Sequence, residues 1–162
     1  MWGRKSSNVP QRQVDSRFHR LRLIASGPVV GGPPGRVKVS PTAKLGNVVI
    51  NTMSGNVVIG DYCFFGQEAM LLTGTHDFTA TGAERQERIP DSGRDIIIED
   101  GAWIASRAII IGPCRIGANA VVCCGCVIDF DVPPDTIVRA HQDLRLEPIR
   151  FRDRSELLRS SS

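Results

Sequence analysis

The hydrophobic pattern of this chain repeats every six residues between positions 98 and 133. A branched aliphatic residue fills the first place of each hexad, namely Ile98, Ile104, Ile110, Ile116, Val122 and Ile128. A small or slender residue fills the fifth place, namely Ala102, Ala108, Cys114, Ala120, Cys126 and Val132. This period fits neither an α-helix nor a plain alternating strand. It predicts short strands separated by tight turns, with one large and one small side chain per face pointing inward.

Three such faces make one triangular coil of about eighteen residues, and successive coils stack at the strand spacing of about 4.8 Å. The turns need a fourth residue that tolerates positive φ, and Gly101, Asn119 and Gly125 stand at that place. We therefore predict an all-β fold, a parallel β-helix.

The same period is present earlier in the chain, with two extra residues near Asn51 and Thr52. The expected first-and-fifth pairs are Val39 with Ala43, Leu45 with Val49, Met53 with Val57, Ile59 with Cys63, Phe65 with Ala69, and Leu71 with Thr75. The pattern is lost over residues 77–95, a polar stretch too long for a simple connector, which predicts a functional or disordered loop. Pro133 and Pro134 cannot donate ladder hydrogen bonds and should end the regular coil.

This pattern divides the chain into three parts. Residues 1–36 form an N-terminal extension and linker, with helical spacing over 14–25 and a turn-rich segment over 27–35. Residues 37–138 form the β-helix domain, and residues 139–162 form an arginine-rich C-terminal tail. The length of 162 residues fits a single domain.

Composition excludes several classes of protein. A net charge of +3 is too small to indicate nucleic-acid binding. No apolar run approaches the about eighteen residues of a membrane span, and the N-terminus lacks the apolar core of a signal peptide, so we expect a cytoplasmic protein. Cys63, Cys114 and Cys126 fall on inward places. Cys123 and Cys126 form a CxxC, but no second pair completes a metal site, so buried packing explains the cysteines better.

Three segments resemble a known family: THDF at 75–78, GRDIIIEDGAWIASRAIIIGPCRIGANAVV at 93–122, and VPPDTIV at 132–138. They resemble the hexapeptide-repeat acyltransferases, and within them the sugar O-acetyltransferases related to galactoside and maltose acetyltransferases. The resemblance implies a left-handed parallel β-helix, acetyl-CoA as acyl donor and no metal. It also implies a homotrimer with sites between subunits, and a sugar or polysaccharide hydroxyl as acceptor.

The resemblance also implies that His76, where the coil breaks out into the long loop, is the catalytic general base. An alcohol attacks a thioester poorly, and an imidazole can take its proton as the new bond forms. The group that orients His76 stays open: a backbone carbonyl, Glu68 or another subunit. Asn47, Asn51 and Asp77 are expected on the acceptor side, and the alternative for Asn47 and Asn51 is that they are turn-forming residues.

For the acyl-CoA side, the resemblance points to Trp103, to the backbone around Ala105 and Ser106, and to Cys124 one coil further on. Trp103 stands at an outward place, and its ring could also be covered by the loop or by a neighbouring subunit. Two features depart from the family. Phe130 stands where a lysine is usual, and the sequence RAHQD at 139–143 replaces a Gly-Asn-Pro-Ala-Lys signature. We therefore expect Arg139, and with it Arg145, to supply the cation for the nucleotide phosphates.

Two other functions use the same fold. A γ-class carbonic anhydrase needs three histidines around a metal, but His19, His76 and His141 are too widely spaced for that arrangement. A non-catalytic β-helical scaffold or assembly subunit is the alternative from a different class. His76, the loop and Trp103 favour the enzyme.

Overall fold

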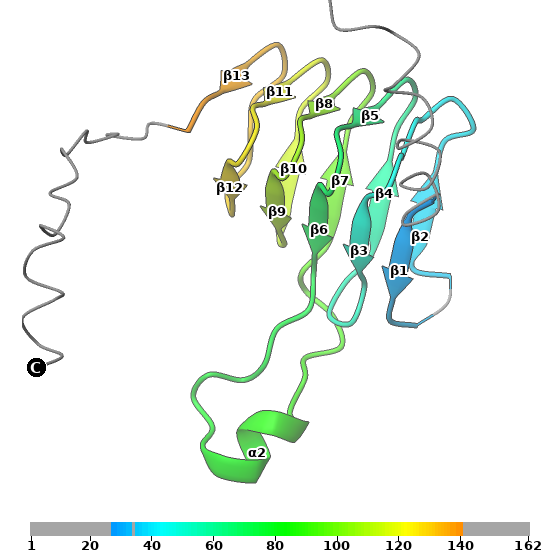
Figure 1. Cartoon of the computed structure of the whole chain (residues 1–162). Coiled ribbons are helices and arrows are strands. Elements are labelled where there is room, and N and C mark those ends of the chain that lie inside the picture. The colour runs from blue at the N-terminus through cyan, green and yellow to red at the C-terminus, as the bar shows by residue number, and fades with distance from the viewer. Residues whose placement is uncertain (1–26, 34, 141–162) are drawn as a thin grey trace, which may run out of the picture.

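The computed structural model describes residues 27–33 and 35–140, which form a parallel β-helix with one long loop (Figure 1). This confirms the predicted all-β class. The strands are β1 (Val29–Gly31), β2 (Val37–Val39), β3 (Val49–Asn51), β4 (Val57–Ile59), β5 (Phe64–Phe65), β6 (Met70–Leu72), β7 (Ile96–Ile98), β8 (Trp103–Ile104), β9 (Ile109–Ile111), β10 (Cys114–Ile116), β11 (Val121–Val122), β12 (Val127–Ile128) and β13 (Ile137–Val138). The helix is α2 (Gly82–Glu87).

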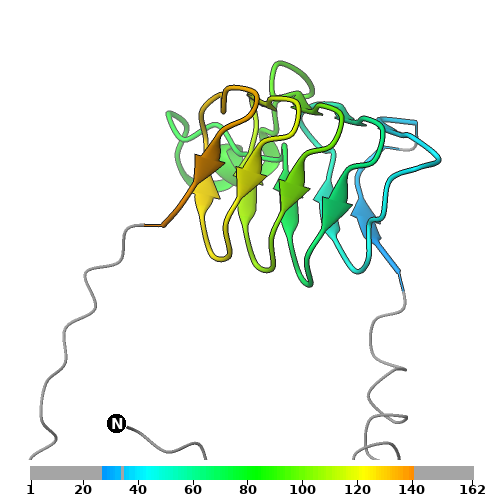
Figure 2. The ribbon, with the colours of Figure 1, turned by 90° about the horizontal axis from the view of Figure 1, so that it is seen from above.

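The strands form three parallel sheets, one for each face of the coil. We name them by their members: sheet A is β1-β3-β6-β9-β12, sheet B is β2-β4-β7-β10, and sheet C is β5-β8-β11-β13. Each strand pairs with the equivalent strand of the next coil, so Val57 lies beside Ile96 and Phe64 beside Trp103. Figure 2 shows the resulting turns stacked side by side along one axis.

The interior is the column of side chains that the hexads predict. All six first-place residues from Ile98 to Ile128 are at most 1% exposed, and the fifth-place residues are at most 6% exposed. Gly101, Asn119 and Gly125 have φ values of 72°, 55° and 70°, as the turns require. Burying one isoleucine side chain stabilises a fold by about 1.5–3 kcal/mol, so this column is the main source of stability of the coil.

The expected register is wrong at Val39, which is 38% exposed, between positions 45 and 54, and at Thr75, whose inward place is taken by Thr73. Val48, not Val49, lies inside with Ile50, and Met53 is 37% exposed. At the corner between sheets A and B, the buried positions are occupied instead by polar residues: Thr52 and Ser54 in one coil, and Thr73 in the next. The Thr73 hydroxyl donates to the Asn51 carbonyl (2.9 Å) and accepts from the Ser54 N–H (3.2 Å). Buried hydroxyls bonded in this way are stable without hydrophobic character, and the hydrophobic pattern does not reveal them.

Pro133 and Pro134 do not end the coil as expected, because β13 beyond them pairs with β11 in sheet C. Two further elements lie in segments that the sequence assigns differently. Strand β1 falls in the segment assigned to the linker, and it extends sheet A by pairing with β3. Helix α2 falls in the loop, where no helix was expected. The helix predicted over residues 14–25, the C-terminal tail beyond residue 140, His19, His141 and Arg145 all lie outside the described residues. None of the described helices is long and apolar enough to cross a membrane.

Candidate active site

The loop that carries His76 leaves the β-helix at the corner between sheets A and B, after β6, and returns at β7 (Figure 1). Its two ends are held close together by Ser54 of the preceding coil. The Ser54 hydroxyl accepts from the Thr75 N–H (3.4 Å), and the Ser54 carbonyl accepts from the Arg94 N–H (3.2 Å). Arg94 Nε donates to the Thr73 carbonyl (2.8 Å). The base of the loop is therefore fixed to the rigid coil.

His76 is exposed and has a defined orientation. Its Nδ1 lies 3.0 Å from the carbonyl oxygen of Arg85 in helix α2. Because a carbonyl can only accept a hydrogen bond, Nδ1 is the donor in this bond, and in the neutral imidazole Nε2 then keeps its lone pair. Of the groups within this chain that the sequence left open, a backbone carbonyl and not Glu68 contacts His76. Glu68 instead pairs with Arg107 at another corner, with 2.8 Å between Oε2 and Nε.

Asp77 closes the loop against helix α2. One carboxylate oxygen accepts from the N–H (2.9 Å) and the hydroxyl (2.5 Å) of Thr79, and the other lies 3.6 Å from Arg88 Nη1. The Asp77 N–H donates to the Arg88 carbonyl (3.0 Å). The Thr79 hydroxyl and N–H, with a smaller effect of Arg88, hold the pKa of Asp77 below its usual value. Asp77 is therefore ionised at neutral pH, with its side chain committed to the turn.

A cavity of about 550 Å³ lies beside His76. It is lined by Thr75, His76, Asp77, Phe78, Arg88, Ile89, Pro90, Asp91 and Arg94. The Phe78 ring is 83% exposed, and the Arg94 guanidinium has no partner for its two terminal nitrogens within the described residues. An acceptor placed here would meet an imidazole, an aromatic ring and a guanidinium. We call this the acceptor cavity.

The residues expected to hold acyl-CoA gather elsewhere, on the outer face of sheet C. A cavity of about 730 Å³ is lined by Trp103, Ala105, Val121, Cys123, Cys124, Ile137, Arg139 and Ala140. A second cavity, of about 430 Å³, is lined by Gln67, Glu68, Ser106, Arg107, Cys124 and Gly125, and shares Cys124 with the first. Together these form what we call the donor groove. It brings together all five residues predicted for acyl-CoA.

The backbone N–H groups of Ala105, Ser106 and Cys124 differ in their hydrogen bonding. The Ala105 N–H is used within the coil, where it donates to the Val122 carbonyl (2.9 Å). Within the described residues, neither the Ser106 N–H nor the Cys124 N–H has a hydrogen-bond acceptor. Ser106 and Cys124 stand at equivalent turns of successive coils, since Val121–Val122 pairs with Trp103–Ile104 in the same register.

Trp103 is 42% exposed and is not covered by the loop within this chain. It stacks on Phe64 of the preceding coil, with ring centroids 5.4 Å apart and an interplanar angle of 18°. Phe64 was not predicted as a site residue. The sequence could have predicted it, because Phe64 directly precedes a first-place residue, as Trp103 does. The structure pairs the two residues in sheet C.

The two asparagines serve as turn residues. Asn51 Oδ1 accepts from the Met53 N–H (3.0 Å), and Asn47 Oδ1 accepts from the Glu68 N–H (3.0 Å). Asn51 lies near the base of the loop, because a Cβ added to Gly74 would come within 2.5 Å of Asn51 Oδ1. Asn47 lies at the corner between sheets C and A, with Glu68. The structure therefore brings Asn51, but not Asn47, toward His76.

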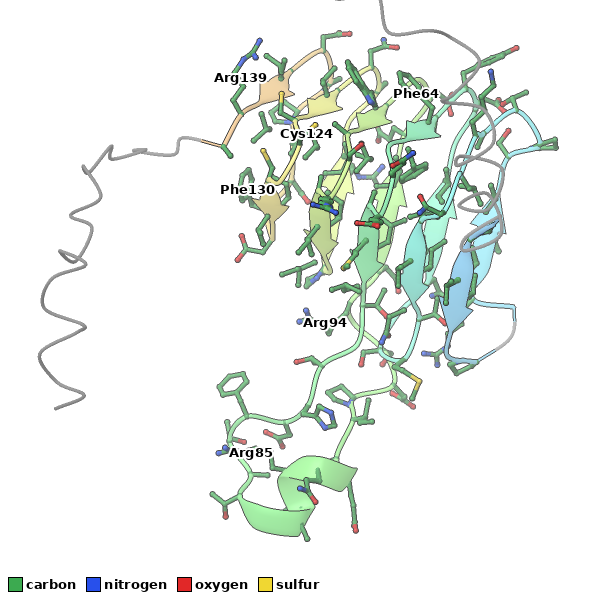
Figure 3. The ribbon with its side chains drawn as sticks, in the orientation of Figure 1. Phe64, Arg85, Arg94, Cys124, Phe130 and Arg139 are labelled. Atoms are coloured by element: carbon green, nitrogen blue, oxygen red, sulfur yellow. The ribbon has the colours of Figure 1, made fainter. Side chains whose placement is uncertain are left out.

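The acceptor cavity and the donor groove lie apart in one chain. Figure 3 shows Arg85 and Arg94 at the loop, whereas Cys124 and Arg139 lie toward the opposite side of the β-helix. The separation follows from topology, since the loop leaves from the corner between sheets A and B, and the donor groove occupies sheet C and its corner with sheet A. The protein is thus a parallel β-helix with a histidine-bearing loop and a separate groove.

Comparison with known proteins finds similar sequences among the serine acetyltransferases. The chain is 30% identical over 102 residues to serine acetyltransferase 4 of Arabidopsis thaliana, covering 63% of this chain and 27% of that protein. It is 34% identical over 86 residues to a serine acetyltransferase of Staphylococcus aureus, covering 53% of this chain and 40% of that protein. The chain therefore spans less than half the length of these relatives. No family model matches the chain.

Solved structures similar to this one include a hexapeptide-repeat acetyltransferase from Vibrio cholerae and a maltose O-acetyltransferase from Clostridium difficile. The first is 23% identical with a TM-score of 0.46, covering 75% of this chain and 73% of that chain. The second is 22% identical with a TM-score of 0.46, covering 80% of this chain and 73% of that chain.

Proposed function

We propose that this protein is an acetyl-CoA-dependent O-acetyltransferase in which His76 is the general base and a sugar or polysaccharide hydroxyl is the acceptor. One observation carries the proposal, namely the hydrogen bond from His76 Nδ1 to the Arg85 carbonyl (3.0 Å). It leaves Nε2 unprotonated and turned away from the bond, as a base must be. The similarity to proteins named as acetyltransferases supports the same chemistry.

The reaction needs one proton acceptor and no covalent intermediate on the enzyme. The acceptor hydroxyl gives its proton to His76 Nε2 while its oxygen attacks the thioester carbonyl carbon. The tetrahedral oxyanion collapses, the carbon–sulfur bond breaks, and the imidazolium returns the proton to the thiolate of coenzyme A. A positioned base contributes about 10²–10⁴-fold to such a step, and orienting two bound reactants contributes further.

The donor groove suits the extended arm of acetyl-CoA. The amides of Ser106 and Cys124, which have no acceptor within the described residues, can donate to carbonyl oxygens of pantetheine or to the developing oxyanion. Trp103 offers an apolar wall along the groove, and Arg139 supplies a cation at its far end for the phosphates. Arg139 thereby takes over from the lysine that Phe130 replaces.

We propose a homotrimer, because the reacting groups of one chain are separated by the body of the β-helix. A neighbouring copy that lays its sheet C beside the loop brings its donor groove to His76. Closed cyclic assemblies of identical chains are built from such heterologous contacts. A catalytically active monomer, measured by sedimentation during turnover, would contradict this arrangement.

Serine is the second candidate acceptor. The relatives named serine acetyltransferases favour it. So does Arg94 in the acceptor cavity, because its terminal nitrogens have no partner within the described residues and could bind a carboxylate. Sugars offer hydroxyls without a carboxylate, so Arg94 separates the two candidates. An Arg94→Met variant should raise the KM for serine strongly and the KM for a neutral sugar only weakly.

The function is tested by thiol release from acetyl-CoA with a panel of mono- and oligosaccharides and with L-serine. We expect release with at least one acceptor, and a fall of about 10²–10⁴-fold in kcat for His76→Ala. Lys38→Met, on the outer face of sheet B, is the matched control and should retain full activity. Release that is unchanged in His76→Ala removes the histidine from the mechanism, and no release with any acceptor favours the non-catalytic scaffold.

A further inference from the structure

Helix α2 has few sources of stability of its own. It spans six residues, none of which is buried, and its N-cap residue Thr81 makes no side-chain capping bond. Isolated helices shorter than about 12–15 residues are marginal in water. The position of its backbone, and with it the carbonyl that His76 uses, therefore depends on bonds to the rest of the loop.

Arg85 supplies such bonds from its own side chain. Its Nε donates to the Ala80 carbonyl (2.6 Å), and its Nη2 donates to the Phe78 carbonyl (3.3 Å). These two acceptors belong to the turn that directly follows His76. The same residue thus hydrogen-bonds to the turn through its guanidinium and to the His76 ring through its main-chain oxygen.

We propose that Arg85 is the positioning residue of His76, a role that rests on the proposed function of His76 as general base. Its side chain fixes the distance between the turn at 78–80 and helix α2. Its carbonyl then holds the proton on His76 Nδ1 and keeps Nε2 free for the acceptor hydroxyl. Arg85 touches neither substrate nor reacting atom and acts only through the imidazole.

The residue type matters for this role. A guanidinium is planar and presents several N–H groups in a fixed fork, so it can hold two carbonyls in one geometry, whereas a lysine ammonium is a flexible point donor. Arg88 differs in kind, because it pairs with the carboxylates of Asp77 and Glu84 and its side chain is 64% exposed. Exposed ion pairs of that type are weakened by salt. The Arg85 bonds go to neutral carbonyls, so the positioning of His76 should persist in salt.

The experiment follows the imidazole directly by ¹⁵N NMR of ring-labelled protein at a pH where the ring is neutral. His19→Gln and His141→Gln form the background, leaving His76 as the one histidine of the chain. In that background we compare Arg85, Arg85→Lys and Arg85→Met, with Gln86→Ala as the matched control in the same helix. Thermal unfolding of each variant shows that the β-helix is intact.

With Arg85 present, we expect Nδ1 protonated and Nε2 unprotonated, unchanged by 0.5 M salt and by Gln86→Ala. Arg85→Met should give a mixture of the two tautomers, with kcat reduced by about tenfold and the KM for acetyl-CoA unchanged, because only the positioning of the base is lost. For Arg85→Lys, both the tautomer population and kcat should lie between those of the parent and of Arg85→Met. Because lysine keeps the positive charge, such intermediate values would show that the geometry of the guanidinium matters and not its charge alone.

A tautomer population and a kcat that are both unchanged in Arg85→Met would overturn the proposal. So would a parent protein with the proton on Nε2. A tautomer shift in Arg85→Met together with no thiol release from any variant, the parent included, would support the positioning role of Arg85 and reject the proposed function. The two failures are therefore distinguishable in one set of samples.

Discussion

Residues 96–138 and residues 74–95 lie next to each other in the chain and are stabilised in different ways. The first stretch buries a column of aliphatic side chains and pairs every strand with its neighbours in adjacent coils. In the second stretch Ala80 is the one buried residue, and the structure is held by hydrogen bonds and ion pairs of Arg85, Arg88 and Asp77. The coil gives the molecule its stability, and the loop carries the one histidine of the described residues.

This contrast explains why an exposed histidine stands at the corner where the loop leaves the coil. Side chains inside the coil are packed against aliphatic neighbours on three sides, which leaves no room for a substrate and no water for a titrating group. At the corner, by contrast, the chain is anchored by Ser54 and Thr73 and then leaves the packed body. His76 directly follows Thr75, whose N–H donates to Ser54, so it combines exposure with a fixed position.

The largest expected effect comes from removing the loop. Replacing residues 77–92 by a short Gly-Ser linker keeps Ser54, Thr73, Thr75 and Arg94, which already hold the two ends together. We expect loss of thiol release by at least about 10²-fold, because His76 loses its orienting carbonyl. We also expect the midpoint of urea unfolding to stay close to that of the parent protein. A large drop in that midpoint would show that the loop supports the coil, and would contradict the claim that the coil alone gives the molecule its stability.

A smaller effect, confined to the coil, comes from one inward residue. Ile98→Ala should reduce the free energy of unfolding by about 2–5 kcal/mol, because it leaves a cavity in the column. Ile97→Ala, the outward neighbour in β7, is the matched control and should cost less than half as much. Urea unfolding measures both. In protein that is still folded, kcat should be unchanged in each variant, and equal costs at the two positions would contradict the assignment of inward and outward faces.

The smallest effect is a difference in thiol reactivity within the coil. Burial raises the pKa of the Cys114 thiol to about 11, so this thiol is protonated and covered at neutral pH. Cys124 is exposed in the donor groove. Iodoacetamide should modify Cys124 at least about tenfold faster than Cys114, as followed by mass spectrometry of peptides.

Acetyl-CoA should slow the reaction of Cys124 and leave that of Cys114 unchanged. In urea the two rates should become similar, which serves as the control for intrinsic reactivity. Absence of protection by acetyl-CoA would argue against the donor groove, although it would leave the fold untouched.

The hexads from Ile98 to Ile128 predict the fold because the column requires large and small residues in strict alternation. The prediction fails near Thr52, Ser54 and Thr73, where the corner is filled by hydroxyls that satisfy one another. It misses helix α2 for a related reason. A helix with no buried face leaves no hydrophobic period in the sequence, and its contacts are made by side chains to backbone atoms.

The candidate site was predictable to different degrees in its two parts. The donor groove follows from the register, since residues at equivalent turns of successive coils must line up, as Ser106 and Cys124 do. His76 came from resemblance to a family and not from the pattern. The role of Arg85 could not be predicted, because the fold of the loop brings its carbonyl to a ring nine residues earlier in the chain.

The anchoring of the loop by Ser54 and Thr73 has a consequence for how such proteins can diversify. Both ends of the loop are secured before the chain leaves the body, so a different insert could be grafted between them without disturbing any neighbour. Acceptor preference could then change by exchange of a single surface segment. The β-helix and its donor groove would stay unchanged, and a new specificity would require a change in the loop alone.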